Sequence, residues 1–586
     1  MDVTLAAVSL PREEPIVGAR TVRIAAFAVL IGIASGFLAQ MLMALIGLIT
    51  NAAYYHRLSP ELVSPAGASP GLLSAIVVPV AGGLVIGLMA RFGSSAIRGH
   101  GIPEVMDKVL HGESRIPMRL VFLKPLSAAV AIGTGGPFGA EGPIIATGGA
   151  LGSTIGQVLR ISTDERKTLL AAGAASGMAA TFGSPVSAVL LAVELLLFEY
   201  RARSIIPVAL AATAATAVRI GLEGTGPIFT MPPLSQPSGA ALASYVVLGA
   251  LMGILAAGVS RAIFAIEDAF ERLPVHWMWW PAIGAVVVGV VGYVDPRTLG
   301  VGYDLIESIL SGSLLGVTLW TFVLLKFISW SVYLGSGTSG GTLAPLFLIG
   351  GGAGAGLGAI AAAWVPSLGI SPSIAGLVGM AATFAGASHA LLASVVFAFE
   401  TTRQPLGLLP LLGGCSAAYL VALLLSRTSI MTERLARRGT RVETEYSLDY
   451  LTRIPVRDAM STRLVTLEAA RTLQSVRAWL DAGADSATHQ GFPVVNASGA
   501  LLGVVTRRDL TGAEQPDRSV GSVIKRPPVV IFPDSTLREA ADQMVRTQVG
   551  RLPVVERRDL RRLVGILSRS DVIAAHARRL EHLEEE

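Results

Sequence analysis

The chain has 586 residues, of which 52% are hydrophobic and 15% are charged, and its mean hydropathy is +0.61. This composition predicts an integral membrane protein, not an enzyme, with enough chain for an additional soluble domain. The net charge of +5 is dispersed and forms no aromatic and basic groove, so nucleic acid is not an expected partner, and the one cysteine, Cys415, excludes an intrachain disulfide or a cysteine-rich metal site.

Residues 1–20 are expected to form a short polar tail, because they lack the charged start and the cleavage site of a signal peptide. Some of the hydrophobic runs that follow, within 21–428, are long enough to cross about 30 Å of hydrocarbon, whereas others are short or are cut by glycine and proline. This mixture predicts discontinuous and re-entrant helices that line a cavity. The runs are Thr21–Thr50, Gly71–Met89, Leu120–Val158, Leu169–Leu197, Ile205–Val218, Ala240–Ile266, Trp277–Val294, Leu314–Leu334, Leu343–Val365, Ile374–Phe399 and Leu406–Leu425.

The stretch Gly133–Gly156 is rich in glycine and carries one charged residue, Glu141, with no other charge between Lys124 and Arg160. A lone carboxylate in a membrane segment is costly and therefore indicates a functional site. The alternative is a close-packed helix contact, in which the glycines let backbones approach and Glu141 pairs with a distant arginine. We favour the functional interpretation, because Gly-Ala-Glu-Gly-Pro does not resemble a regular helix interior.

The hydrophobic region contains an internal repeat with an offset of 202 residues. Gly133–Gly156 matches Gly335–Gly358 in its glycine and proline positions, and the hexapeptide Gly177–Phe182 recurs unchanged at the same offset. The region therefore consists of two related halves, about 21–225 and 240–428, and a transport site is expected between them at the ends of broken helices. The repeat alone does not show whether the halves are parallel or inverted.

Three short segments follow the pattern Gly-x-x-x-Pro, and two of them are repeat mates. Glycine keeps backbone N–H groups accessible and proline fits the first turn of a helix, so the pattern favours helix N-termini that bind an anion weakly. Weak binding lets the anion leave as well as enter. A carboxylate in such a site competes with the anion until it is protonated, which makes Glu141 a candidate gate and proton acceptor. The segments are Gly99–Pro103, Gly139–Pro143 and Gly341–Pro345.

Beyond the last hydrophobic run the chain changes character. A cluster of arginines within 427–441 predicts a cytoplasmic location by the positive-inside rule, and short β-type runs then alternate with amphipathic helices. Phe492–Asp509 recurs as Leu552–Asp571, and a strand, a turn, a strand and a helix are expected in each copy. The expected boundaries are 429–450 for a linker, 451–512 and 518–577 for the two copies, and 578–586 for a polar tail.

The three glycine and proline segments resemble the anion-site motifs of the CLC family of chloride channels and chloride/proton exchangers. The family usually carries Gly-Ser-Gly-Ile-Pro, Gly-Lys/Arg-Glu-Gly-Pro and Gly-x-Phe-x-Pro, and the resemblance extends from Thr21 to about Arg438. It implies an α-helical polytopic membrane protein with inverted-repeat halves, and a homodimer with one pore per subunit in the cell membrane and both termini in the cytoplasm. The soluble repeats resemble the α/β pair of CBS domains that many CLC proteins carry.

By this resemblance Glu141 matches the gating glutamate of the family. His100 stands in place of the usual serine, Ala140 in place of lysine or arginine, Leu343 in place of phenylalanine, and Met431 in place of a tyrosine that coordinates the anion. The loss of both hydroxyl groups puts a preference for chloride in question, because neither methionine nor leucine donates a hydrogen bond. The implied anion-binding residues are Gly99, His100, Gly101, Ile102, Pro103, Ala140, Glu141, Gly142, Thr342, Leu343, Ala344 and Met431.

Two positions leave alternatives open. The ring of His100 either replaces the serine as a donor and titrates near its ordinary pKa of ~6.5, or points away and leaves the anion to backbone amides. Leu195 occupies the position of the inner proton-transfer glutamate of many exchangers. Glu194 and Glu199 are the nearest acids for a proton path, but on a continuous helix they would point about 140° apart, and structural roles near the cytoplasmic face are the alternative.

Lys124 and Lys326 share the 202-residue offset. They are expected either to line a vestibule and raise the local concentration of anions or to extend their ammonium groups to the membrane surface. His389 is expected at a helix end or in a packing role, and Glu400 is expected to be a structural partner in the second half.

In the soluble pair, Thr506 with Asp509 and Ser568 with Asp571 resemble the Ser/Thr-x-x-Asp residues that contact ribose in nucleotide-binding CBS domains. A hydroxyl and a carboxylate suit a vicinal diol, so an adenine nucleotide is a candidate ligand. The alternative is a scaffold for dimerisation only. No other cofactor is expected to be required.

The sequence therefore predicts transport of chloride or a related small anion through a pore gated by Glu141 and regulated by the CBS pair. We favour channel-like conduction, because Leu195 and Met431 both depart from the usual exchanger. The alternative is proton-coupled antiport that uses Glu141 with another inner acid or with water. From other classes, a CBS-regulated magnesium transporter would need several membrane carboxylates, and a nucleotide sensor with a membrane anchor would not need matched anion motifs.

Overall fold

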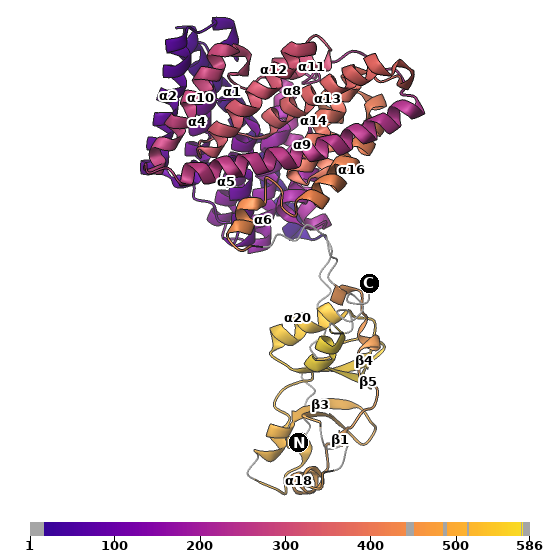
Figure 1. The fold of residues 1–586 in the computed structure, drawn as a ribbon. Helices are drawn as coiled ribbons and strands as arrows, with labels where there is room; N and C mark the ends of the chain where they lie inside the picture. Colours follow the sequence, from indigo (N-terminus) through magenta and orange to yellow (C-terminus); the bar gives the residue numbers. More distant parts are fainter. Residues whose placement is uncertain (1–16, 441–449, 484–488, 513–514, 576, 578–586) are drawn as a thin grey trace. The chain divides into compact units, whose positions relative to one another are not determined.

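The protein is described here from a computed structural model that covers residues 17–440, 450–483, 489–512, 515–575 and 577. Its internal contacts divide the chain into a helical membrane unit, Ile16–Thr444, and a C-terminal α/β unit that starts at Glu445. Figure 1 traces the helices and strands of both units.

The helices of the membrane unit form two sets that match one to one, followed by the short α17. Within the described residues, eight helices are long and apolar enough to cross a membrane, and shorter apolar helices lie between them, as the broken hydrophobic runs predicted. The first set is α1 (Ala19–Tyr54), α2 (Leu72–Leu88), α3 (Ile102–Leu110), α4 (Leu120–Gly133), α5 (Glu141–Val158), α6 (Thr163–Phe182), α7 (Pro185–Ala192) and α8 (Ala202–Glu223). The rest are α9 (Gly239–Glu271), α10 (Trp280–Val294), α11 (Tyr303–Leu310), α12 (Gly316–Gly335), α13 (Leu343–Trp364), α14 (Pro372–Ser388), α15 (Leu391–Thr402), α16 (Leu408–Leu425) and α17 (Glu433–Arg437).

Three of the predicted hydrophobic runs, 120–158, 169–197 and 374–399, are each divided into two helices. Two of these divisions occur where a residue has a positive φ, which a right-handed helix cannot contain. Gly183 ends α6 with φ +58°, and His389 ends α14 with φ +61°, which confirms the helix-end role expected for this histidine.

Small residues bring helices of each half into close contact. α5 packs on α6, and its repeat mate α13 packs on α14. A Cβ atom on Gly148 would lie 2.1 Å from the carbonyl oxygen of Gly173, and one on Gly350 would lie 2.5 Å from that of Gly379. The glycines inside these helices therefore serve close packing, as the alternative interpretation of the glycine-rich stretch expected for them.

The two halves meet at an antiparallel contact between equivalent segments. The segments before α5 and α13 form a bridge in which the N–H of Gly341 donates to the carbonyl oxygen of Gly139 at 3.0 Å. Equivalent segments that run antiparallel are related by a two-fold axis perpendicular to them. The halves are therefore inverted, and the N-termini of α5 and α13 face each other.

Exchanged helix caps also join the halves. Glu194, just after α7, accepts hydrogen bonds from the first N–H groups of α15, both at 3.0 Å. Glu400 on α15 accepts hydrogen bonds from the first N–H groups of α7 at 3.1 and 2.8 Å. Each carboxylate thus satisfies donors that a helix N-terminus leaves free, which is the structural role expected for both residues.

Lys124 on α4 and Lys326 on α12 are buried repeat mates, with 2% and 0% of their surface exposed. The Nζ of Lys124 donates to the carbonyl oxygens of Ile97 and Gly99, both at 2.8 Å, and the Nζ of Lys326 donates to the equivalent loop before α11, both at 2.9 Å. The vestibule role and the membrane-surface role predicted for them are therefore wrong. Each ammonium group fixes the loop that leads into α3 or α11.

The C-terminal unit contains two copies of one motif, as its sequence repeat predicted. In each copy an antiparallel hairpin leads into a helix, and the registers are equivalent, with Gly491 opposite Thr506 and Arg551 opposite Ser568. Strand β1 adds a parallel partner to β2. The elements are β1 (Leu467–Glu468), α18 (Leu473–Asp481), β2 (Gly491–Val495), β3 (Leu501–Thr506), α19 (Arg507–Thr511), α20 (Leu537–Thr547), β4 (Arg551–Glu556), β5 (Asp559–Ser568) and the helical residues 569–575.

Candidate functional site

Three helices of the membrane unit begin at the three Gly-x-x-x-Pro segments. α3 begins at Ile102, α5 at Glu141 and α13 at Leu343, and the proline of each segment lies in the first turn. The antiparallel bridge joins the segments before α5 and α13, and the N–H of Gly99 donates to the carbonyl oxygen of Thr338 at 2.8 Å. Free N–H groups at three helix starts therefore converge between the halves.

The side chain of Glu141 lies in this region and is completely buried (0% exposed). Its Oε1 accepts a hydrogen bond from the hydroxyl of Tyr303 at 2.6 Å. The N–H groups of Glu141 and Ala344 approach the carboxylate short of full hydrogen-bond geometry, so Oε2 has no hydrogen-bond partner. Among the described residues the partners of this carboxylate are thus a tyrosine and backbone amides, and the arginine partner considered from the sequence is wrong.

The carboxylate folds back over the loop before α5, and Gly139 makes this position possible. A Cβ atom on Gly139 would lie 1.8 Å from Oε2, and one on Gly341 would lie 3.0 Å from the same oxygen. The charged group thereby occupies the space between the N-termini of α5 and α13, where helix dipoles and N–H groups favour a negative charge. Chemically, this arrangement lets the carboxylate and a free anion compete for one place.

His100 and Met431 are brought close together on another side of the convergent segments. His100 is 3% exposed, its ring interacts with the backbone of Ile430, and its Nδ1 has no hydrogen-bond partner. Met431, the next residue, is completely buried. The hydroxyl groups of Thr338 and Thr342, before α13, are also buried without a partner. Such atoms indicate a place for a polar ligand or water.

The acids considered for a proton path have other contacts. Glu194 caps α15, and Glu199 accepts a hydrogen bond from Ser204 at 2.7 Å. The helix that would separate them by 140° does not exist, because a π-helical turn, Val193–Leu197, follows α7 and Phe198 has φ +52°. Leu195 is buried. The condition of a continuous helix is therefore not met, and neither acid is directed to Glu141 by these contacts.

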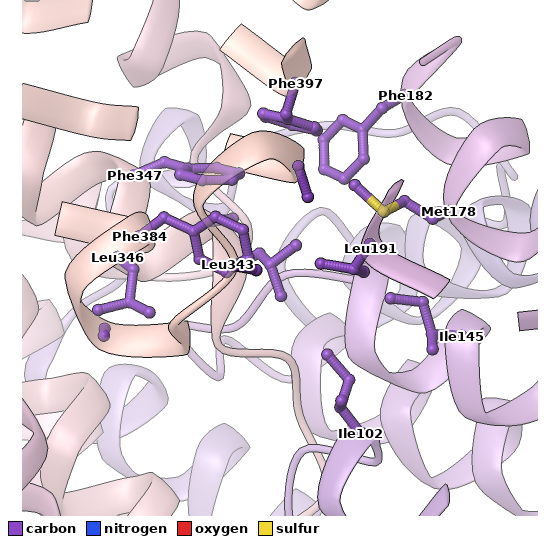
Figure 2. Close-up of a cluster of buried hydrophobic side chains, with 14 of the residues drawn as sticks. Ile102, Ile145, Met178, Phe182, Leu191, Leu343, Leu346, Phe347, Phe384 and Phe397 are labelled. Carbon is purple, nitrogen blue, oxygen red and sulfur yellow. The ribbon is translucent and has the colours of Figure 1, made fainter. Parts of the chain in front are cut away.

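Apolar side chains from both halves surround the convergent helix starts (Figure 2). In this view Leu343 of the second half and Leu191 of the first point toward one another, and the phenylalanine rings lie above them. The ring centroid of Phe397 is 4.8 Å from that of Phe182 and 4.7 Å from that of Phe347. This apolar lining lowers the local dielectric constant, which strengthens any electrostatic interaction in the site.

In the C-terminal unit, both Ser/Thr-x-x-Asp motifs form helix caps. Thr506 donates to Asp509 at 2.5 Å, and Ser568 donates to Asp571 at 2.8 Å. The first pair also lines a cavity of about 360 Å³ together with Lys525, Arg526 and Arg551. Burial raises the pKa of Asp509, but hydrogen bonds from Lys525 and Thr506 outweigh it and hold this pKa below its usual value. The cavity thus presents one carboxylate and several cations.

Tyr303 is the residue of this site that sequence reasoning missed. It lies 162 residues from Glu141 and belongs to none of the Gly-x-x-x-Pro segments. One signal was available, because Gly302 and Tyr303 at the start of α11 correspond to Gly101 and Ile102 at the start of α3 when the 202-residue offset is shortened by one residue. A polar residue opposite an apolar repeat mate would have marked the position.

Comparisons with known proteins identify the families to which the two units of the chain belong. A family model described as voltage gated chloride channel matches residues 81–423, and a CBS domain model matches residues 456–515 and 520–578. The chain is 32% identical over 358 residues to a protein of Vibrio campbellii named H(+)/Cl(-) exchange transporter ClcA, which covers 60% of this chain and 76% of that protein.

Two solved structures share the fold. A slow cyanobacterial Cl-/H+ antiporter has a TM-score of 0.65 at 21% identity, over 72% of this chain and 98% of that one. A eukaryotic CLC transporter has a TM-score of 0.59 at 22% identity, over 94% of this chain and 98% of that one.

The inverted halves and the convergent helix starts define a multi-pass membrane transport protein. Because the family model matches more than half of the chain, the protein belongs to the voltage gated chloride channel family, known as CLC, and its C-terminal unit is a pair of CBS domains. It is therefore an anion transport protein, which confirms the family and the fold that the motifs predicted.

Replacement of Gly139 by alanine is expected to displace the Glu141 carboxylate, because the added Cβ would overlap Oε2. We expect chloride flux from liposomes at neutral pH to rise about fivefold, the effect of ~1 kcal/mol on the balance between gate positions. Gly149→Ala is the control, since its Cβ would lie 3.7 Å from the nearest atom. Equal flux in both variants would contradict this account of the carboxylate.

Proposed function

We propose that the protein exchanges a small anion, chloride in the first instance, for protons, and that Glu141 is both the gate and the proton acceptor. One observation carries the proposal. In a member of this family, a buried carboxylate lies between the facing N-termini of α5 and α13 and has no cationic partner among the described residues. The names of the similar exchanger and antiporter favour this reading over the channel that the sequence suggested.

In the proposed cycle, ionised Glu141 holds the space between the helix starts and keeps the anion out. Protonation removes its charge, the neutral side chain leaves, and an anion takes its place against the N–H groups of α5 and α13. When the proton leaves, the carboxylate returns and displaces the anion. Weak binding through amides and dipoles lets the anion leave after each exchange.

The path of the proton beyond Glu141 distinguishes an exchanger from a channel. Leu195 offers no proton acceptor, and Glu194 and Glu199 are engaged in structural hydrogen bonds. We assign this step to water or to the ring of His100, whose Nδ1 has no partner. The second candidate function remains uncoupled conduction, which Leu195 and Met431 favour.

A magnesium transporter fits the site less well. Divalent cations require several oxygen ligands, preferably carboxylates. The neighbours of Glu141 are instead N–H groups and a hydroxyl donor, which favour a negative charge. By family resemblance we further propose a homodimer with one pore per subunit in the cell membrane, and both termini in the cytoplasm.

The first experiment tests coupling. In liposomes with equal chloride on both sides, an imposed proton gradient is expected to drive chloride uphill. Glu141→Gln is expected to abolish this uphill movement and to retain chloride flow down its own gradient, because the side chain no longer takes a proton. Glu468→Gln, at an exposed residue of the C-terminal unit, is the control. Without proton-driven accumulation in the parent chain, the exchanger is wrong and the channel remains.

His100→Ser tests the second part of the site. If the ring faces the anion, a serine hydroxyl is expected to increase the preference for chloride over nitrate about tenfold, the value of ~1.4 kcal/mol from one hydrogen bond to a charged group. The flux should also lose any part of its pH response that titration of this ring causes. His111→Ser, at an exposed histidine, is the control. Unchanged selectivity and pH response would remove His100 from the site.

The CBS pair is proposed to bind an adenine nucleotide in the cavity beside Asp509. Asp509→Ala in the full chain is expected to weaken ATP or AMP binding about tenfold, because one hydrogen bond to the ribose is lost. Asp571→Ala is the matched control, since Asp571 forms the same cap but does not line this cavity. Titration by calorimetry checks the result, and no binding to the parent chain would leave the scaffold interpretation.

A further inference from the structure

The carboxylate of Glu141 and its tyrosine partner come from opposite halves of the membrane unit. Glu141 is the first residue of α5, and Tyr303 is the first residue of α11. Within the described residues, Tyr303 is the side chain that hydrogen-bonds to this carboxylate. The repeat mate of Glu141 is Leu343, and Ile102 holds the position in α3 that Tyr303 holds in α11, so the pseudo-symmetric site has this polar contact on one side only.

Aromatic neighbours fix the direction of the Tyr303 hydroxyl. The ring packs edge to face on Phe182 with centroids 5.8 Å apart, and the ring of Phe229 lies 6.2 Å away. Phe182 in turn packs on Phe397, as Figure 2 shows. The buried ammonium of Lys326 holds the backbone just before α11. The hydroxyl is therefore preorganised toward Glu141.

Tyr303 also stands between Glu141 and open space. It lines a cavity of about 560 Å³ together with Glu61 and Glu223, and a second cavity of about 180 Å³ together with Asp304. Glu141 is completely buried, whereas Tyr303 is partly exposed. A proton that comes from these cavities therefore arrives beside Tyr303, the hydrogen-bond partner of the carboxylate.

We propose that Tyr303 is the latch of the Glu141 gate, whose hydroxyl holds the ionised carboxylate between α5 and α13. The proposal rests on the proposed function and names the residue that sets the acidity at which the gate opens. An O–H donor binds a carboxylate more strongly than a neutral carboxylic acid, so the bond favours the closed gate. On opening, a hydronium ion from the water that fills the cavity transfers its proton to Glu141, which forms the new O–H bond and leaves a neutral water molecule, and Tyr303 ends the step with its hydroxyl proton in place.

Other charged groups near Tyr303 are not in contact with Glu141. Glu223 pairs with Arg219 at 2.8 Å, Lys326 donates to backbone carbonyl groups, and Glu61 and Asp304 face the cavities. Replacement of Tyr303 by phenylalanine changes none of their charges, so an altered pH response of that variant reports the latch.

Tyr303→Phe removes the hydroxyl and keeps the ring. In liposomes we expect the pH of half-maximal chloride flux to move about one unit toward alkaline values, equal to the loss of ~1.4 kcal/mol. In the Glu141→Gln background the same replacement is expected to change nothing. Tyr54→Phe is the control, because its buried hydroxyl donates to the carbonyl oxygen of Thr134 at 3.0 Å, away from the gate.

A second variant tests the same proposal if Tyr303→Phe does not fold. Incorporation of 3-fluorotyrosine at Tyr303 makes the phenol a stronger donor and is expected to move the half-maximal pH toward acidic values. An unchanged half-maximal pH in both variants, with Glu141→Gln still insensitive to pH, overturns the latch alone. An equal shift in the Glu141→Gln background also overturns it. If Glu141→Gln keeps the parent's pH response, the gate of the proposed function is wrong as well.

Discussion

A carboxylate buried between two helix N-termini is the constraint on which the membrane unit depends. A charge in an apolar interior is unstable unless donors surround it, and Glu141 has no basic partner in the described part of the chain. The fold supplies the donors by directing the starts of α5 and α13 at each other. That approach is possible because the segments before both helices are glycine-rich and join at the bridge between Gly139 and Gly341. The inverted repeat is thus the simplest way for one chain to present two such helix ends to one charge.

Residues that recur in both halves have different roles from residues whose repeat mates differ. Polar groups that occur in both halves fix the backbone. The buried Lys124 and Lys326 bind the loops before α3 and α11, and the partly exposed Glu194 and Glu400 cap each other's helices. In the proposed function, the positions where the halves differ bear on transport. Glu141 faces its repeat mate's helix start, where Leu343 is apolar, and its partner Tyr303 begins α11 where Ile102 begins α3. A perfectly symmetric site would bury either two carboxylates or none, and neither arrangement gives a single gate.

The parts that were predictable from the sequence are those that depend on local pattern. The 202-residue offset predicted the halves, and Gly-x-x-x-Pro predicted three helix starts, because both signals lie within a few residues of the feature. Contacts between distant residues carried no such signal. The acceptors of Lys124 are carbonyl oxygens, which every residue has, so composition suggested a vestibule cation. The turn at Val193–Leu197 was missed because an apolar run predicts a continuous helix, whereas the cap that Glu194 provides to α15 is a tertiary contact.

The residues that depart from the family pattern are unevenly distributed around the proposed gate, Glu141. Their distribution affects how anion movement would be coupled to proton movement. Glu141, its glycines and both facing helix starts are kept, whereas His100, Leu195 and Met431 differ from the usual exchanger. Anion displacement needs only the kept part. Proton transfer needs a route onward from Glu141, and an apolar side chain at position 195 removes one acceptor from that route. In the proposed function, a water chain or the His100 ring replaces that acceptor. Exchange and conduction would then use the same anion site and differ in one rate, that of the proton beyond Glu141.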